Sequence, residues 1–197
     1  KNLEAHQMED FRIQRKKYLG EAIQYYQNAT IALVDSFDNK DPFTNPNLRN
    51  VRSEIQLVEV LKKKALAMEK MSDILLSEFN KDGFYRYAVA SLNTLSKSVD
   101  LIHSLQIGFD SEESRLFLSQ NQESTFDETM RIAYKLYEQT NKTEFLERAF
   151  GFSERSKSSN LLASVKDTKA KEFGGIPDTL IERENFLKSS IANDPSM

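Results

Sequence analysis

Apolar side chains recur at helical spacing along most of this chain, and no segment shows the Val, Ile and Thr alternation of strands. Only four prolines and six glycines interrupt 197 residues, which also favours long helices. The sequence therefore predicts an all-α protein. Its cleanest stripe steps by four and three through Phe84, Ala88, Ser91, Leu95, Ser98, Ile102 and Leu105.

Polar turns divide the periodic stretches into six to seven expected helices. The clearest interruption is "DSFDNKDPFTNPN" at 35–47, where Asp, Asn, Pro and Thr cluster as they do in loops. "NKDG" at 80–83 and "QTNKT" at 139–143 are shorter turn signals. The expected helices cover 3–35, 48–71, 84–106, 112–139 with a kink or short break at 119–125, 144–170 and 179–191.

Composition narrows the function classes. Hydrophobic residues make up 39% and charged residues 29%, as in a soluble globular chain. The net charge of -3 is spread without a basic stripe, which argues against a nucleic-acid partner. The chain lacks cysteine, so disulfides, thiol nucleophiles and cysteine-bound metals are excluded. No apolar run approaches the ~20 residues of a membrane helix. A cytoplasmic location is favoured, with export left open, and no cofactor is expected.

Small residues mark a repeat along the chain. A small residue at every seventh position lets a neighbouring helix approach closely, while the position between them fills the groove. The first small residues of the three copies stand at 22, 91 and 149, intervals longer than the roughly 34 residues of a tetratricopeptide repeat (TPR). We expect a TPR-like superhelix of long antiparallel hairpins. The packing residues are Ala22, Tyr26 and Ala29, then Ser91, Leu95 and Ser98, then Ala149, Ser153 and Ser156.

Three strings resemble the repeat region of bacterial proteins that join TPRs to a caspase-like CHAT domain. They are "EAIQYYQNATIALVDSFDNKDPFTNPN", "AFGFSERSKSSNLL" and "KEFGGIPDTLIERENFLKSSI". The resemblance implies a TPR-like array at 1–172, a hinge at 173–178, and a last helix and tail at 179–197 leading to a peptidase domain absent from this chain. It implies a scaffold that recognises partners or regulates the peptidase-like domain, without enzymatic activity of its own.

A protein or peptide partner is therefore expected, and the missing C-terminal domain is one candidate. In hairpin repeats the first helices line the groove, so the expected contact residues come from these helices. The chain itself is expected to be a monomer or a weak dimer through its last helix. The expected partner-binding residues are Glu54, Lys62, Arg131, Lys135 and Glu138.

Other readings of the sequence stay open. A ligand-sensing module could bind a small molecule between hairpins and relay strain through 173–178. A metal-dependent helical-bundle enzyme could use Asp100 and His103, one turn apart, although a di-metal site needs further carboxylates. Ser153 and Lys157 lie four residues apart, but a hydroxyl nucleophile also needs an oxyanion hole, and no glycine-rich turn adjoins them. Close packing explains the serines better.

Overall fold

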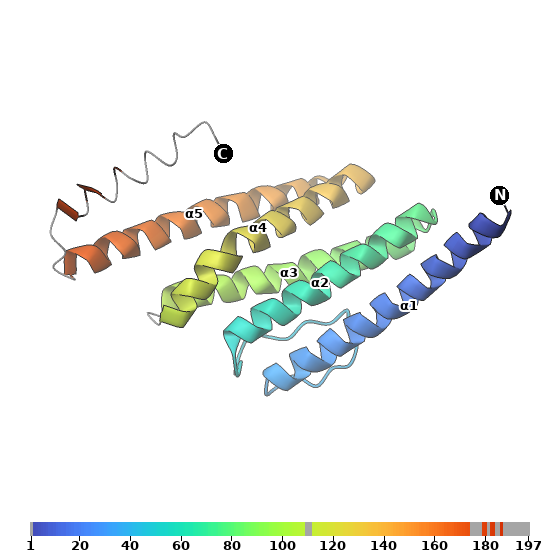
Figure 1. Ribbon diagram of the computed structural model, residues 1–197, viewed down its shortest axis with the longest axis horizontal. Coiled ribbons are helices and arrows are strands. Elements are labelled where there is room, and N and C mark those ends of the chain that lie inside the picture. Colours follow the sequence, from blue (N-terminus) through green and yellow to red (C-terminus); the bar gives the residue numbers. More distant parts are fainter. Residues whose placement is uncertain (1, 109–111, 174–178, 181, 184–185, 187–197) are drawn as a thin grey trace. The chain divides into compact units, whose positions relative to one another are not determined.

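A computed structural model describes residues 2–108 and 112–173, together with helical residues at 179–180, 182–183 and 186. These residues form five α-helices and no strand, which confirms the all-α prediction (Figure 1). Six to seven helices are predicted from the sequence, and the described residues show five long ones. The helices are α1 (Asn2–Leu33), α2 (Glu54–Ser77), α3 (Lys81–Gly108), α4 (Glu112–Thr140) and α5 (Thr143–Phe173).

The chain divides into two compact units, residues 1–156 and 157–197. The first contains α1 to α4 and the first part of α5. The second contains the remainder of α5 and the short helical pieces at 179–186. Most of the expected hinge and of the expected helix 179–191 lies outside the described residues.

The α2–α3 hairpin lies at the centre of the first unit. Ser91 is fully buried, and its Oγ donates to the carbonyl oxygen of Ala65 at 2.7 Å. Two turns further along α3, the Ser98 Oγ donates to Val58 at 3.5 Å. Because the later α3 residue meets the earlier α2 residue, the helices run antiparallel.

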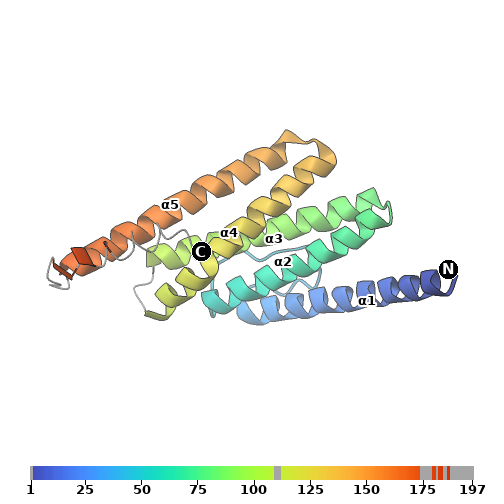
Figure 2. The ribbon, with the colours of Figure 1, turned by 45° about the horizontal axis from the view of Figure 1, so that its top comes forward.

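Both hairpins of the first unit contribute to one apolar core. The second hairpin joins α4 to α5 through Asn141 and Lys142 (Figure 2). Buried side chains of the two hairpins pack together, and half-buried loop residues cover the margin of the core. Among the large side chains of this core are Leu57, Leu61, Phe84, Leu92, Leu95, Leu101, Ile102, Leu105, Phe126, Ile132, Leu136, Phe145 and Phe152.

The segment between α1 and α2 is longer than the sequence predicts. Helix was expected to resume at 48, yet α2 begins at Glu54, after Ser53, whose Oγ accepts from the Gln56 N–H. The preceding residues fold back on α1 instead, and the Arg52 N–H donates to the Leu33 carbonyl at 2.9 Å. Val51 still packs against the core, which explains why its spacing resembled a helix. Of the kink or short break expected at 119–125, the break is wrong, since α4 is helical throughout.

A buried lysine holds this connecting segment in place. Lys64 of α2 is fully buried, and its Nζ donates to Gln27 Oε1 at 2.6 Å, Asn45 Oδ1 at 3.2 Å and the Thr44 carbonyl at 3.4 Å. The Asn45 oxygen also accepts from the Thr94 hydroxyl of α3. One polar cluster thus links α1, the connecting segment, α2 and α3.

Burial lowers the pKa of Lys64 from 10.5 to about 8, although the negative charge of Asp41 opposes this shift. Between those two values the unfolded chain binds the proton and the folded chain does not, so the free energy of unfolding rises with pH. The free energy of unfolding of the native chain, taken relative to that of Lys64→Met, should rise by roughly 3 kcal/mol between pH 8 and pH 10.5. Urea unfolding at several pH values measures this difference. If the difference in free energy of unfolding between the native chain and the variant did not change with pH, Lys64 would not be held in this buried environment.

The turn between α2 and α3 places a phenylalanine where glycine is usual. The Phe79 N–H donates to Leu76 and the Asn80 N–H to Leu75, the hydrogen-bond pattern of a Schellman motif. Phe79 occupies the left-handed position of this motif, with φ 59°, and its side chain is 91% exposed. A bulky side chain in this conformation costs free energy without gaining contacts.

Replacing Phe79 with glycine should therefore stabilise the chain by about 1 kcal/mol. Phe79→Ala is the matched control, because it removes the same ring and keeps the Cβ atom that causes the strain. Thermal unfolding should rank the glycine variant first, with the alanine variant near the native chain. An equal gain in both variants would assign the effect to the exposed ring.

Candidate partner-binding surface

Helices α2 and α4 lie side by side in a constant register. Lys62 Nζ donates to Ser124 Oγ at 2.8 Å, Arg131 binds Glu69, and Lys135 binds Asp73. In each pair the two residues are 62 positions apart. A constant separation means that the two helices run in the same direction. We call this surface the α2–α4 face and define it by these six residues with Tyr134 and Glu138.

Glu69 is the centre of the charges on this face. Its side chain is only 8% exposed, and its two carboxylate oxygens accept from Arg131 Nη1 and Nη2. Lys135 Nζ lies 3.3 Å from the same carboxylate, and Glu128 also accepts from Arg131. Burial raises the pKa of Glu69, but Arg131 and Lys135 together outweigh it, so the pKa lies below 4.5. The hydrogen bonds that Arg131 donates to Glu69 in turn raise the pKa of Arg131.

The five expected contact residues therefore differ in availability. Lys62, Arg131 and Lys135 already bind the neighbouring helix. Glu138 is exposed, and no hydrogen bond or ion pair to it occurs among the described residues. Glu54 has a buried Oε2 atom without a hydrogen-bond partner among the described residues, and burial raises the pKa of its carboxyl group.

Tyr134 is the aromatic side chain that sequence reasoning did not place on this face. It is half-exposed on α4, one turn from both Arg131 and Glu138. Its ring lies against Tyr137, with ring centroids 6.2 Å apart. The spacing of 131, 134 and 138 along a predicted helix could have indicated this cluster.

Helices α3 and α5 also lie in parallel register within the first unit. Arg148 Nη2 donates to Asn93 Oδ1 at 3.0 Å, and Arg155 Nη2 donates to Asp100 Oδ1 at 2.9 Å. Each pair is 55 residues apart. At the start of α5, the buried Phe145 meets Tyr85 edge-on. Arg155, in the Glu-Arg-Ser-Lys string of the sequence, thus binds the preceding hairpin.

The residues expected to pack the repeats lie at different depths. Ser91, Leu95 and Ser98 are fully buried on α3. The corresponding residues of α1 and α5 are half-buried: Ala22, Tyr26, Ala29, Ala149, Ser153 and Ser156.

Among the described residues, no third metal ligand joins Asp100 and His103. Asp100 binds Arg155, while His103 is exposed. No group of three or more His, Asp or Glu side chains able to hold a metal ion occurs in the part of the chain that the structure describes. Within the same ranges, no helix is long and apolar enough to span a bilayer.

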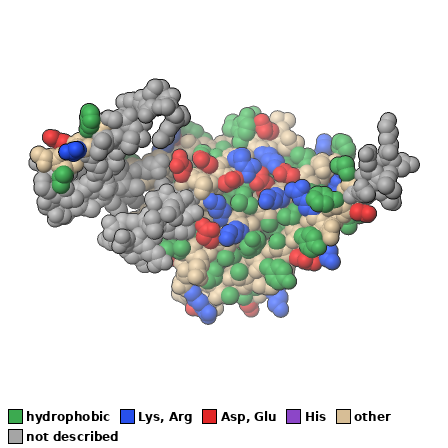
Figure 3. Space-filling view, viewed as in Figure 1, with side chains coloured by type: hydrophobic (Ala, Val, Ile, Leu, Met, Phe, Trp, Pro, Cys, Tyr) green, Lys and Arg blue, Asp and Glu red, His purple; other side chains and the backbone are tan. Residues whose placement is uncertain are grey.

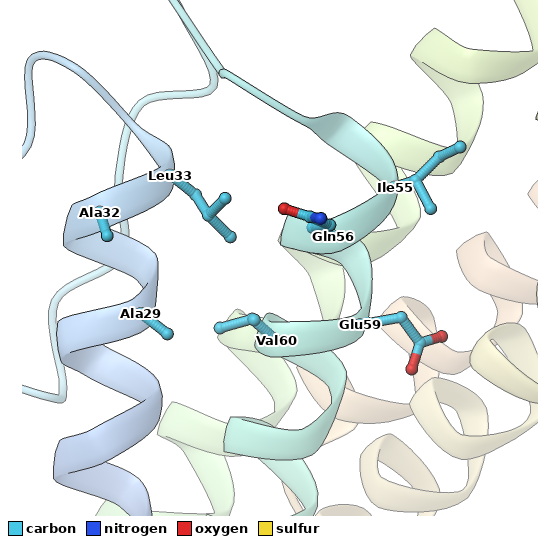
Figure 4. A pocket seen from close by; sticks show the side chains of 7 residues that line it. All are labelled: Ala29, Ala32, Leu33, Ile55, Gln56, Glu59 and Val60. Atoms are coloured by element: carbon cyan, nitrogen blue, oxygen red, sulfur yellow. The ribbon is translucent and has the colours of Figure 1, made fainter.

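A second surface feature lies between α1 and α2. It is an apolar groove of about 460 Å³, and its helices contribute facing side chains (Figure 4). Ala29 and Leu33 of α1 point toward Val60 of α2, while Ile55 and Glu59 point away from α1. The complete lining is Ala29, Ala32, Leu33, Ile55, Gln56, Glu59 and Val60.

The space-filling view shows Lys, Arg, Asp and Glu side chains interspersed with hydrophobic side chains on the visible face (Figure 3). Comparisons with family models, curated proteins and solved structures find no match to this chain.

The Glu69–Arg131 pair should matter more than an exposed pair. Arg131→Met leaves a nearly buried carboxylate with only Lys135, so it should lower the free energy of unfolding by roughly 2 kcal/mol. Arg52→Met removes the exposed partner of Asp35 and should cost less than about 1 kcal/mol. Urea unfolding at pH 7 compares the two variants. Equal costs would show that the Glu69 pair contributes no more than a surface pair.

Proposed function

We propose that this chain is a non-enzymatic helical scaffold that binds a protein or peptide partner through the α2–α4 face. The observation that carries the proposal is the constant register of α4 on α2. Three polar contacts at the same separation hold two long helices parallel and align their side chains along one surface. A surface fixed in this way is preorganised, which reduces the entropic cost of binding.

The chemistry of the face suits an extended polar ligand. Tyr134 supplies a half-exposed aromatic side chain of the kind that often anchors interfaces. Glu138 supplies an unpaired acid one turn away, and the Arg131 and Lys135 side chains border it. An ion-paired arginine remains able to donate further hydrogen bonds, since a guanidinium carries five.

Parallel registers between α2 and α4 and between α3 and α5 support the reading of two stacked hairpins. We propose a TPR-like superhelical arrangement for such hairpins. The family resemblance further suggests that the scaffold recruits partners to, or regulates, a peptidase-like domain of a longer protein. Under this proposal the bound segment comes from that domain or from a separate protein.

Selection of displayed random peptides on the purified chain tests the proposal. Peptides that bind should lose at least about tenfold in affinity for the Tyr134→Ser, Glu138→Lys double variant, because it removes the anchor and reverses the free charge. Phe150→Ser on α5 is the matched control, since it removes an exposed aromatic outside the face. Failure to select any specific peptide, or equal affinity for all variants, would contradict the proposal.

A further inference from the structure

Helix α1 carries two apolar faces, and α2 covers one of them. Ile23 is buried on the inner face, and Leu19 and Tyr26 pack partly buried against the same cluster. On the outer face Phe11, Tyr18 and Tyr25 follow one another at seven-residue steps and are 66%, 57% and 71% exposed. A helix with apolar side chains on two sides normally packs against two neighbours.

The outer face has the spacing of a coiled-coil seam. Phe11, Tyr18, Tyr25 and Ala32 form one seven-residue row. Arg15, Ala22 and Ala29 form a second row, offset from the first by four. Steps of four and three residues between the rows place both of them on one side of the helix. There the large aromatic side chains alternate with the small side chains of Ala22 and Ala29. Ala29 and Ala32 also line the α1–α2 groove, so the seam and the groove are continuous.

Three basic side chains border this surface, which also holds the acidic Glu21 of α1 and Glu59 of the groove lining. On α2, Gln56 lines the groove, and Lys63 and Lys70 follow it at seven-residue steps along the same side of the helix. Both lysines are exposed, as is Arg15 within the seam of α1. Among the described residues, none of these three cations has a hydrogen bond or an ion pair. The charge therefore remains available to a ligand.

We propose that the outer face of α1 and the adjoining groove bind an amphipathic helix of a partner protein. The partner's apolar side packs against Tyr18, Tyr25 and the gaps at Ala22 and Ala29. Its acidic side chains face Arg15, Lys63 and Lys70. This surface is separate from the α2–α4 face, so the inference goes beyond the proposed function and can fail independently of it.

Charge distinguishes this occupant from a second copy of the chain. In a two-fold dimer the same patch faces itself, so the three cations of each copy would be enclosed in one interface with the three of the other. Like charges brought together at an interface oppose association. An acidic helix instead pairs with them, and its apolar side covers the exposed aromatics.

Two synthetic helical peptides of about 21 residues provide the test. Both carry Leu and Ala at heptad spacing, one with Glu and the other with Lys at the flanking positions. Fluorescence anisotropy at about 0.15 M salt should show binding of the Glu peptide at least tenfold tighter than that of the Lys peptide. The double variant Tyr18→Ser, Tyr25→Ser should bind the Glu peptide about tenfold more weakly than the native chain does. Lys63→Glu with Lys70→Glu should remove the preference for the acidic peptide.

Lys17→Glu is the matched control, because Lys17 is exposed on α1 but outside both rows. It should leave the affinity within about twofold of the native chain. Failure of both peptides to bind, equal binding of the two, or equal losses in the control and lysine variants would overturn the proposal. So would a native dimer that Tyr18→Ser and Tyr25→Ser dissociate, as measured by sedimentation. The Tyr134 and Glu138 variants should bind the Glu peptide normally, which separates this test from that of the proposed function.

Discussion

The close approach of α3 to α2 is the contact on which the rest of the first unit depends. Ser91 and Ser98 have side chains small enough to admit the neighbouring backbone, and their hydroxyls bond to its carbonyls. Helix α2 then meets α1 on one side, α4 packs mainly against α3 and also contacts α2, and α3 receives the start of α5. A larger side chain at Ser91 would force the two helices apart and disturb each of these contacts.

Polar contacts specify how the other elements dock on this hairpin. The buried Lys64 satisfies its hydrogen bonds only when Gln27 and the segment around Asn45 lie against it. Leaving that charge unpaired would cost more than the hydrogen bonds themselves gain. The pairs at Glu69 and Asp73 similarly favour one register of α4 on α2. Apolar packing supplies the driving force, and these contacts select among similar packed arrangements.

The sequence predicts the helical class because periodicity is local. It also marks Ser91 and Ser98 by their seven-residue spacing, and the structure places both at the α2–α3 seam. Other features depend on the tertiary fold. Lys64 stands in a run of three lysines and reads as solvated, yet the segment that buries it lies about twenty residues earlier in the chain. Phe79 gave no turn signal, because its conformation is imposed by the hydrogen bonds that end α2.

The candidate surfaces, too, could be predicted from the sequence only in part. Heptad spacing at Phe11, Tyr18 and Tyr25 is visible in the sequence, but only the fold shows which side of α1 is covered. Arg131 and Lys135 could be placed on a first helix of a hairpin. Their engagement with Glu69 and Asp73 could not be predicted, since it joins residues 62 positions apart. Glu138 and Tyr134 remain on that face as groups that a partner can reach.

Cross-linking measures the register of α4 on α2 directly. The chain has no cysteine, so a pair introduced by Lys62→Cys and Ser124→Cys can react only with each other or with another copy. At low protein concentration this pair should cross-link much faster than one made by Lys62→Cys and Arg131→Cys, which is displaced by about 10 Å along α4. Equal rates, or faster cross-linking of the displaced pair, would contradict the register and the scaffold built on it.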